Sequence, residues 1–243
     1  MNKKNQQMLE INKKNIIHNK EKLIKSYGAY TDLDVISSII PYLRLFKLFN
    51  IKPSKILELG SGFGFSTKYL SLLAEEVVGL DYFSEAIEHA KYETKNIKNI
   101  KFLCKDIYKD EIGKEEFDLV FCNNFHPFYR DYYDNSDDQK KNYDLIINKI
   151  YESIVTEGYL AISHIETKKQ NINIEEHISN KFSKLISEID EKVLYSFDSM
   201  ARIIKSKRLF ISIIVFISYL RKILFKLKII KSYKPIWLLK KMY

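Results

Sequence analysis

The chain has 243 residues, of which 46% are hydrophobic and 14% aromatic; this is enough apolar material for one α/β domain with extensions and too much for a disordered chain. Two cysteines, Cys104 and Cys122, exclude a disulfide framework, and we expect both to be reduced thiols in the core. The lysine-rich start, Met1–Lys14, lacks the apolar stretch of a signal peptide, so we expect a cytoplasmic chain.

The positive charge is concentrated at one end of the sequence. The formal net charge is +9, and residues 201–243 hold 12 Lys or Arg and no Asp or Glu. The rest of the chain is therefore slightly acidic. An enzyme that acts on nucleic acid usually carries a basic stripe along its active-site face. The charge distribution thus argues against a nucleic-acid substrate for the body of the chain.

The first fifty residues are predicted to be helical. Residues 1–26 have the composition of a polar helix, and Asp32–Phe49 repeats apolar residues at spacings of three and four. Pro41 predicts a kink or a break in the second helix, because proline removes a backbone donor. Pro53 ends this segment, and we assign residues 1–50 to an N-terminal extension.

From residue 51 the sequence alternates short apolar runs with helical patterns. Five runs have the length and composition of buried strands. Their alternation with helical patterns predicts a parallel sheet with right-handed crossovers and helices on both faces. The five predicted strands are Lys55–Leu59, Glu76–Leu80, Ile100–Cys104, Phe117–Phe121 and Tyr159–Ser163.

Two further strands are predicted after these five. Ile174–Ile189 has the pattern of a polar helix, and the runs Lys192–Phe197 and Leu209–Ile217 then have the composition of strands. We expect these two runs to form an antiparallel hairpin at one edge of the sheet. Residues 51–218 are therefore assigned to one domain.

Residues 219–243 are predicted to form a basic amphipathic tail. Apolar residues from Leu220 to Ile230 share one helical face, Lys and Arg take much of the rest, and Trp237 follows. Two interpretations stay open. The tail lies on the anionic inner face of a membrane, or it packs on the domain with its lysines in solvent.

The most informative motif is the glycine loop Gly60-Ser61-Gly62-Phe63-Gly64. It lies between a predicted strand and a helical pattern, which is the context of a nucleotide-binding loop. Gly60 permits a sharp turn, and Gly62 lets a ligand approach the backbone because no Cβ intervenes. Amides at a helix start can hold a carboxylate or a phosphate. A dinucleotide-binding fingerprint would require a further glycine where the chain has Phe65.

This loop, with Glu58 before it, resembles the first motif of the class I S-adenosylmethionine-dependent methyltransferases, and the resemblance covers about Tyr27 to Ile217. It implies that Asp81, at the end of the second strand, accepts hydrogen bonds from the ribose hydroxyls. It also implies that Asp106 contacts the adenine amino group and that Asn123 faces the methionine end. The implied contacts of S-adenosylmethionine are Glu58, Gly60, Ser61, Gly62, Gly64, Asp81, Tyr82, Asp106, Ile107 and Asn123.

The same resemblance implies a Rossmann-like α/β fold with seven strands. The sheet would be mostly parallel with an antiparallel last strand, and residues 1–50 would form a helical lid. Tyr27 and Tyr30 lie where many members of the family have a lid that touches the cofactor. S-adenosylhomocysteine is the expected product. We expect no metal, because no group of Asp and Asn has the spacing of metal ligands.

Residues after the fourth and fifth strands are candidates for the acceptor chemistry. His126 and His164 follow these strands, and histidine is a suitable general base near neutral pH. The alternative for each is a loop histidine with an ordinary hydrogen bond. Tyr129 and Arg130 are candidates to line an acceptor pocket, with a surface aromatic cluster as the alternative.

The sequence favours methyl transfer to a small molecule. The expected acceptor is an oxygen of a sugar, an envelope-glycan precursor or a quinone-like metabolite, for which a general base would help. Two alternatives stay open: an RNA or protein methyltransferase anchored by the basic tail, and a protein that binds S-adenosylmethionine without catalysis. No feature of the sequence indicates the oligomeric state.

Overall fold

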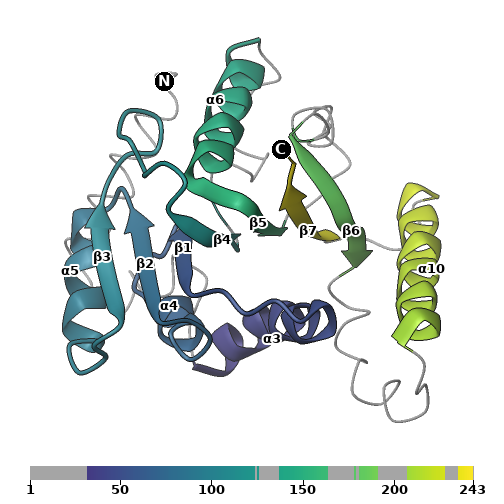
Figure 1. Cartoon of the computed structure of the whole chain (residues 1–243), viewed down its shortest axis with the longest axis horizontal. Coiled ribbons are helices and arrows are strands. Elements are labelled where there is room, and N and C mark those ends of the chain that lie inside the picture. Colours follow the sequence, from purple (N-terminus) through teal and green to yellow (C-terminus); the bar gives the residue numbers. More distant parts are fainter. Residues whose placement is uncertain are drawn as a thin grey trace.

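A single seven-stranded sheet organises the molecule (Figure 1). The computed structural model describes residues 32–123, 125, 137–163, 178, 181–190, 207–227 and 235–242. The strand order is β3-β2-β1-β4-β5-β7-β6, and β7 runs antiparallel to both of its neighbours, whereas the other paired strands are parallel. The strands are β1 (Lys55–Leu59), β2 (Glu76–Asp81), β3 (Ile100–Cys104), β4 (Phe117–Cys122), β5 (Ile154–Ser163), β6 (Phe182–Asp190) and β7 (Pro235–Lys241).

Helices cover both faces of the sheet, as predicted. The two faces are distinguished by β1, whose neighbouring residues Ile56 and Leu57 belong to different core clusters. Ile56 packs in the cluster that also contains residues of helices α3 (Asp32–Phe49) and α4 (Phe65–Leu70). Leu57 packs in the cluster that contains residues of α6 (Asp137–Ser153). Burial on both faces explains the continuous apolar runs of the inner strands.

Most of the predicted elements before residue 164 are confirmed. β1, β3 and α3 have the predicted bounds, and β2 and β4 are each one residue longer. Helix α5 (Ser84–Glu93) packs on β2 and β3. Pro41 lies inside α3, which is continuous from Asp32 to Phe49, so the helix is not broken there and a kink stays a prediction. The described part of the predicted lid is thus α3, which packs on the sheet.

The predicted elements of the C-terminal third need correction. Leu209–Ile217 is not a strand but part of helix α10 (Lys207–Lys226). β6 lies largely inside the predicted polar helix 174–189, and β7 lies inside the predicted tail 219–243. The other predicted strand, Lys192–Phe197, lies outside the described residues.

Long-range pairing explains these differences. β6 forms because its backbone pairs with β7, from Phe182 opposite Lys241 to Asp190 opposite Pro235. β7 is well buried, with Trp237 only 1% exposed. An apolar run such as 209–217 fits a strand or a helix equally well, and periodicity alone does not separate the two. No helix within the described residues is long and apolar enough to cross a membrane.

The two cysteines differ in their surroundings. Both thiols are free, as expected, and Cys122 is buried at the end of β4. Cys104 is exposed at the end of β3, so the prediction that it lies in the core is wrong. β3 is an edge strand, which explains why its last residues are less covered than those of β4.

Candidate functional site

The glycine loop adopts a backbone conformation that requires glycine. Gly60, Gly62 and Gly64 have φ values of 75°, 50° and 75°, in the left-handed region that other residues rarely adopt. The N–H groups of Gly60 and Ser61 both donate to the carbonyl oxygen of Leu80, at 2.8 and 3.1 Å. The loop is therefore fastened to the end of β2 while its own backbone turns from β1 into α4.

Close packing is a second reason for these glycines. A Cβ atom at Gly64 would lie 2.7 Å from the ring of Phe102 and 2.9 Å from Cβ of Ala90. A Cβ at Gly60 would lie 3.0 Å from the ring of Phe125. Phe125 therefore covers the start of the loop, and neighbouring side chains from β3 and α5 press against its end.

Asp81 holds the middle of the loop. Its Oδ2 accepts a hydrogen bond from the N–H of Gly62 at 2.9 Å, and its Oδ1 accepts one from the N–H of Phe83 at 3.0 Å. Burial raises the pKa of Asp81, while hydrogen bonds from the backbone of Gly62, Phe83 and Tyr82 act in the opposite direction. A carboxylate has about four lone-pair sites, so Asp81 retains capacity to accept hydrogen bonds from a ligand.

Glu58 lies beneath the loop as part of β1. The hydroxyl groups of Ser66 and Thr67, at the start of α4, donate to its two carboxylate oxygens. Burial raises the pKa of Glu58 to about 7; the two hydroxyl groups oppose this rise, and the charge of Asp81 adds to it. The side chain thus joins the end of β1 to the first turn of α4.

The predicted adenine contacts follow β3. The carboxylate of Asp106 accepts a hydrogen bond from the N–H of Tyr108 at 3.0 Å and pairs with the ammonium group of Lys109 at 3.0 Å. Ile107 is buried, whereas the side chain of Tyr82, just after β2, is exposed. The N–H of Lys105 donates to the carbonyl oxygen of Asp81 at 2.9 Å, so the ends of β2 and β3 are joined.

The register of the strands brings these residues to one edge of the sheet. Leu59 pairs with Leu80, Asp81 with Cys104, and Glu58 with Phe121. The glycine loop, Asp81, Asp106 and Asn123 therefore all leave the carboxyl ends of the adjacent strands β1, β2, β3 and β4. In open α/β sheets, ligands bind at this edge, where the strand order reverses. Here the reversal lies between β1 and β4.

Tyr42 is a neighbour of the site that sequence reasoning missed. It is buried on α3, its hydroxyl group is 3.5 Å from Oδ1 of Asn123, and its ring packs edge-on against Phe121 at 4.7 Å between centroids. Phe125 and the pair Ser66 and Thr67 were missed as well. Hydroxyl residues soon after a glycine loop were the available signal for that pair. Nothing in the local sequence connects Tyr42 with Asn123.

The candidate residues of the acceptor site lie outside the described residues. They stay predictions, and the structure reports neither their positions nor their contacts. These residues are Tyr27, Tyr30, His126, Tyr129, Arg130 and His164. In the described part of the chain, no group of three or more His, Cys, Asp or Glu side chains is arranged to hold a metal ion.

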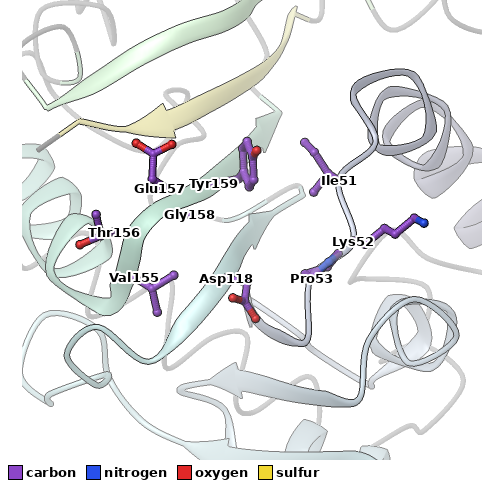
Figure 2. Close-up of a pocket in the computed structure, with 9 residues that line it drawn as sticks. All are labelled: Ile51, Lys52, Pro53, Asp118, Val155, Thr156, Glu157, Gly158 and Tyr159. Atoms are coloured by element: carbon purple, nitrogen blue, oxygen red, sulfur yellow. The ribbon is translucent and has the colours of Figure 1, made fainter.

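A shallow pocket of about 240 Å³ lies near the amino ends of β1 and β4, away from the carboxyl ends where the glycine loop begins (Figure 2). Its lining comes from residues 51–53, from Asp118 near the start of β4, and from residues 155–159 in β5. The carboxylate of Asp118 already accepts hydrogen bonds from the N–H groups of Ser54 and Lys55 at 3.0 and 2.7 Å. This pocket is therefore separate from the glycine loop, and Asp118 serves to join β4 to the start of β1.

The glycine loop has the features that a polar ligand would need. Ser61 is buried, with 4% of its surface exposed, and its hydroxyl group has no hydrogen-bond partner among the described residues. An unsatisfied buried hydroxyl group is costly and calls for a partner. Together with the bare backbone of Gly62 and the spare acceptor capacity of Asp81, it fits a ligand that carries both a carboxylate and hydroxyl groups.

Comparison with known proteins identifies the family. The model of a methyltransferase domain family matches residues 52–208. Over 75 residues the chain is 32% identical to phosphoethanolamine N-methyltransferase 3 of Arabidopsis thaliana. That match covers 30% of this chain, and the chain spans only 15% of the length of that protein.

Solved structures share the fold at low sequence identity. The N-methyltransferase NodS from Bradyrhizobium japonicum WM9 is 12% identical, with a TM-score of 0.54 over 84% of this chain and 97% of that one. The same protein in complex with S-adenosylhomocysteine gives a TM-score of 0.52, with 84% and 88% of the two chains covered at 12% identity. The PH0226 protein from Pyrococcus horikoshii OT3 gives 0.55 at 14% identity, over 88% and 92% of the chains. The chain thus belongs to the methyltransferase domain family, and its fold and glycine loop are those of the class I members, whose cofactor is S-adenosylmethionine.

Proposed function

We propose that this protein transfers a methyl group from S-adenosylmethionine to a small-molecule acceptor. The observation that carries the proposal is the arrangement around Gly62. Its N–H is held by Asp81, its backbone lacks a Cβ, and the neighbouring hydroxyl group of Ser61 is buried and unsatisfied within the described residues. Family membership over residues 52–208 supports the same activity.

We call the glycine loop Gly60–Gly64 together with Asp81 the cradle, and the residues in and around it have distinct proposed roles. The methionine moiety lies against the glycine loop, where the hydroxyl group of Ser61 donates to its carboxylate, and Asp81 accepts hydrogen bonds from the ribose hydroxyls. Asp106 and Ile107 contact the adenine, with Tyr82 beside it, and Asn123 faces the methionine end. Bound S-adenosylmethionine supplies an electrophilic methyl group, so the protein has to align the acceptor and remove its proton.

Glu58 has a supporting role in this proposal. Its side chain is buried, and both carboxylate oxygens accept hydrogen bonds from hydroxyl groups of α4. A carboxylate used in this way fixes the angle between β1 and α4, the two elements that the glycine loop connects. We propose that Glu58 acts on the cofactor through the loop.

An oxygen of a sugar, an envelope-glycan precursor or a quinone-like metabolite is the proposed acceptor. Two observations support it: residues 1–200 are slightly acidic, which disfavours nucleic acid, and two histidines follow strands that end at the site edge. A histidine base would assist an oxygen acceptor near neutral pH. A nitrogen acceptor is the second candidate, because the Arabidopsis relative is named an N-methyltransferase.

A methyl-transfer assay with acceptors of different chemistry tests this proposal. S-adenosylmethionine with a labelled methyl group is offered together with a quinol, a sugar nucleotide, phosphoethanolamine or total RNA, and both the methylated product and S-adenosylhomocysteine are quantified. The proposal expects product with a hydroxylated small molecule. Product from RNA alone would contradict the proposed acceptor. Binding of S-adenosylmethionine without turnover in any arm would favour the non-catalytic alternative.

Two histidine variants identify the general base in the same assay. The proposal expects His126→Gln to lower kcat by about 100-fold with little change in the affinity for S-adenosylhomocysteine, because loss of a general base typically costs 10²–10⁴-fold. His164→Gln is the matched comparison, since that residue follows the neighbouring strand. Equal activity of both variants and the wild type would show that neither histidine acts as a base.

A further inference from the structure

Helix α10 lies in a connection that the sheet does not require. β6 and β7 are antiparallel neighbours, and two such strands can be joined by a two-residue hairpin turn. The chain instead uses residues 191–234 for this connection and places the 20-residue helix α10 within it. Figure 1 shows α10 at the periphery of the molecule, beside the edge strand β6 and at the end of the sheet opposite β3.

One side of α10 is anchored to the domain. Ile217 packs against the core cluster that contains Ile236 and Leu238 of β7, and Ser218 is buried. The helix also contacts β6. Its orientation is therefore fixed, and the opposite side of the helix faces away from the sheet.

The outward side of α10 is mostly apolar, with Ser212 and Lys226 as the exposed polar residues among its described side chains. Phe216 and Tyr219 are each 60% exposed, and the other large exposed side chains of this surface lie at helical spacings from them. We call this surface the α10 face; it consists of Leu209, Val215, Phe216, Tyr219, Leu220 and Leu227. Contiguous exposed apolar surface of this kind is typical of an interaction site.

The charges around the α10 face select its partner. On a helical projection, the exposed Lys226 lies between Val215 and Tyr219, near one border of the face, and residues 201–243 contain no Asp or Glu. A helix with one apolar side, cations at its border and aromatic side chains on the apolar side is suited to the interface of an anionic membrane. Tyr219 adds a ring with a polar end, which suits the boundary between headgroups and acyl chains.

We propose that the α10 face docks this protein on the surface of an anionic phospholipid bilayer. The site overlaps the predicted tail only at residues 219–227, because residues 235–241 form β7 and Trp237 is buried and unable to enter a lipid surface. The proposal goes beyond the methyl-transfer activity and does not depend on it. It places the whole domain at a membrane, where α10 lies in the plane of the headgroups.

Vesicle cosedimentation of the full chain tests the proposal. Wild-type protein is mixed with vesicles of phosphatidylcholine and phosphatidylglycerol in equal parts, and with vesicles of phosphatidylcholine alone. We expect partitioning to the anionic vesicles to be at least about 10-fold stronger. The double variant Phe216→Ser/Leu220→Ser should lose about 10-fold or more of this binding, because it removes exposed apolar contact area. Lys226→Glu should weaken binding to the anionic vesicles and leave binding to the phosphatidylcholine vesicles unchanged.

The matched control is a double variant near β2 and β3, on the side of the sheet away from α10. Leu72 and Tyr92 are 80% and 64% exposed and lie outside the α10 face, so Leu72→Ser/Tyr92→Ser should bind vesicles like the wild type. Circular dichroism and gel filtration accompany each variant. Equal binding by the wild type and the α10 variants would overturn the proposal. A wild-type dimer that Phe216→Ser/Leu220→Ser converts to a monomer, with no vesicle binding, would also overturn it and assign the face to a second copy.

Discussion

The carboxylate of Asp81 and the backbone N–H of Gly62 are joined by a hydrogen bond of 2.9 Å between the last residue of β2 and the middle of the glycine loop. The loop is thereby held in its turned conformation before any ligand is considered. Because a pre-formed site spends less free energy on ordering, this bond favours tight binding of the cofactor.

Gly64→Ala should destabilise the protein strongly. The change adds a Cβ at a left-handed φ of 75°, within 2.9 Å of both Phe102 and Ala90. We expect the free energy of unfolding to fall by about 2–4 kcal/mol, measured by urea denaturation. Asn50→Ala is the matched control, since Asn50 also has a positive φ, of 55°. It should cost about 1 kcal/mol or less, and equal losses in the two variants would contradict the packing argument.

Ser61→Ala should separate stability from ligand binding. The hydroxyl group of Ser61 is buried with no partner in the described part of the chain, so its removal should leave the unliganded protein equally stable or about 1 kcal/mol more stable. Affinity for S-adenosylhomocysteine should fall by about 5- to 10-fold, which corresponds to one hydrogen bond. Thermal unfolding and titration calorimetry measure the two effects. A clear loss of stability without ligand would contradict this interpretation of Ser61.

Glu58 should make stability depend on pH. Its pKa rises from 4.5 to about 7 on folding, so the native state holds the proton more tightly and stability falls as the pH rises through this window. The loss should be about 3 kcal/mol between about pH 5 and about pH 8. Glu58→Gln cannot ionise and should remove this part of the pH dependence, as measured by urea denaturation at the two pH values.

The control for this prediction is the wild type, measured at the same two pH values. Asp81, whose pKa burial also raises, remains in both proteins, so the difference between wild type and Glu58→Gln isolates Glu58. The same pH dependence in wild type and Glu58→Gln would show that Glu58 does not titrate in this window.

Trp237→Ala should test whether the C-terminal strand belongs to the core. Trp237 lies in β7 between β5 and β6 and is 1% exposed. We expect a loss of about 3–5 kcal/mol in the free energy of unfolding, as for other buried large-to-small changes. Leu72→Ala, at an exposed position, should change stability by less than about 0.5 kcal/mol. A small loss in the free energy of unfolding for Trp237→Ala would indicate that β7 does not pack in the core.

The part of the fold around β1, the glycine loop and Asp81 could be predicted from local sequence. β1 has its predicted bounds because a short apolar run is enclosed by Pro53 and Gly60, both of which interrupt regular structure. The glycine loop and Asp81 were recognisable for the same reason. Their residue types follow from a positive φ, a close approach of side chains and a strand-end carboxylate, and these requirements act within about 20 residues.

The structure of β6, β7 and α10 depends on contacts between residues that are distant in the sequence. β6 is a strand because Phe182 and the residues after it pair with β7, which follows a long connection. The apolar run in α10 has a strand-like composition, but it forms a helix. Its buried and exposed side chains alternate with the helical period, because Ser218 is buried and Phe216 and Tyr219 are exposed. The contact between Tyr42 and Asn123 joins residues 81 positions apart, so no local pattern predicts it.

Titration calorimetry with S-adenosylhomocysteine tests the central claim most directly. Asp81 and Asp118 each accept hydrogen bonds from two backbone N–H groups, at opposite ends of the sheet. If the cradle at Asp81 binds the cofactor, the wild type and Asp118→Asn bind with similar affinity, and Asp81→Asn binds about 30-fold more weakly or worse. No heat of binding with folded wild-type protein, or equal loss of affinity in the two variants, would contradict the account.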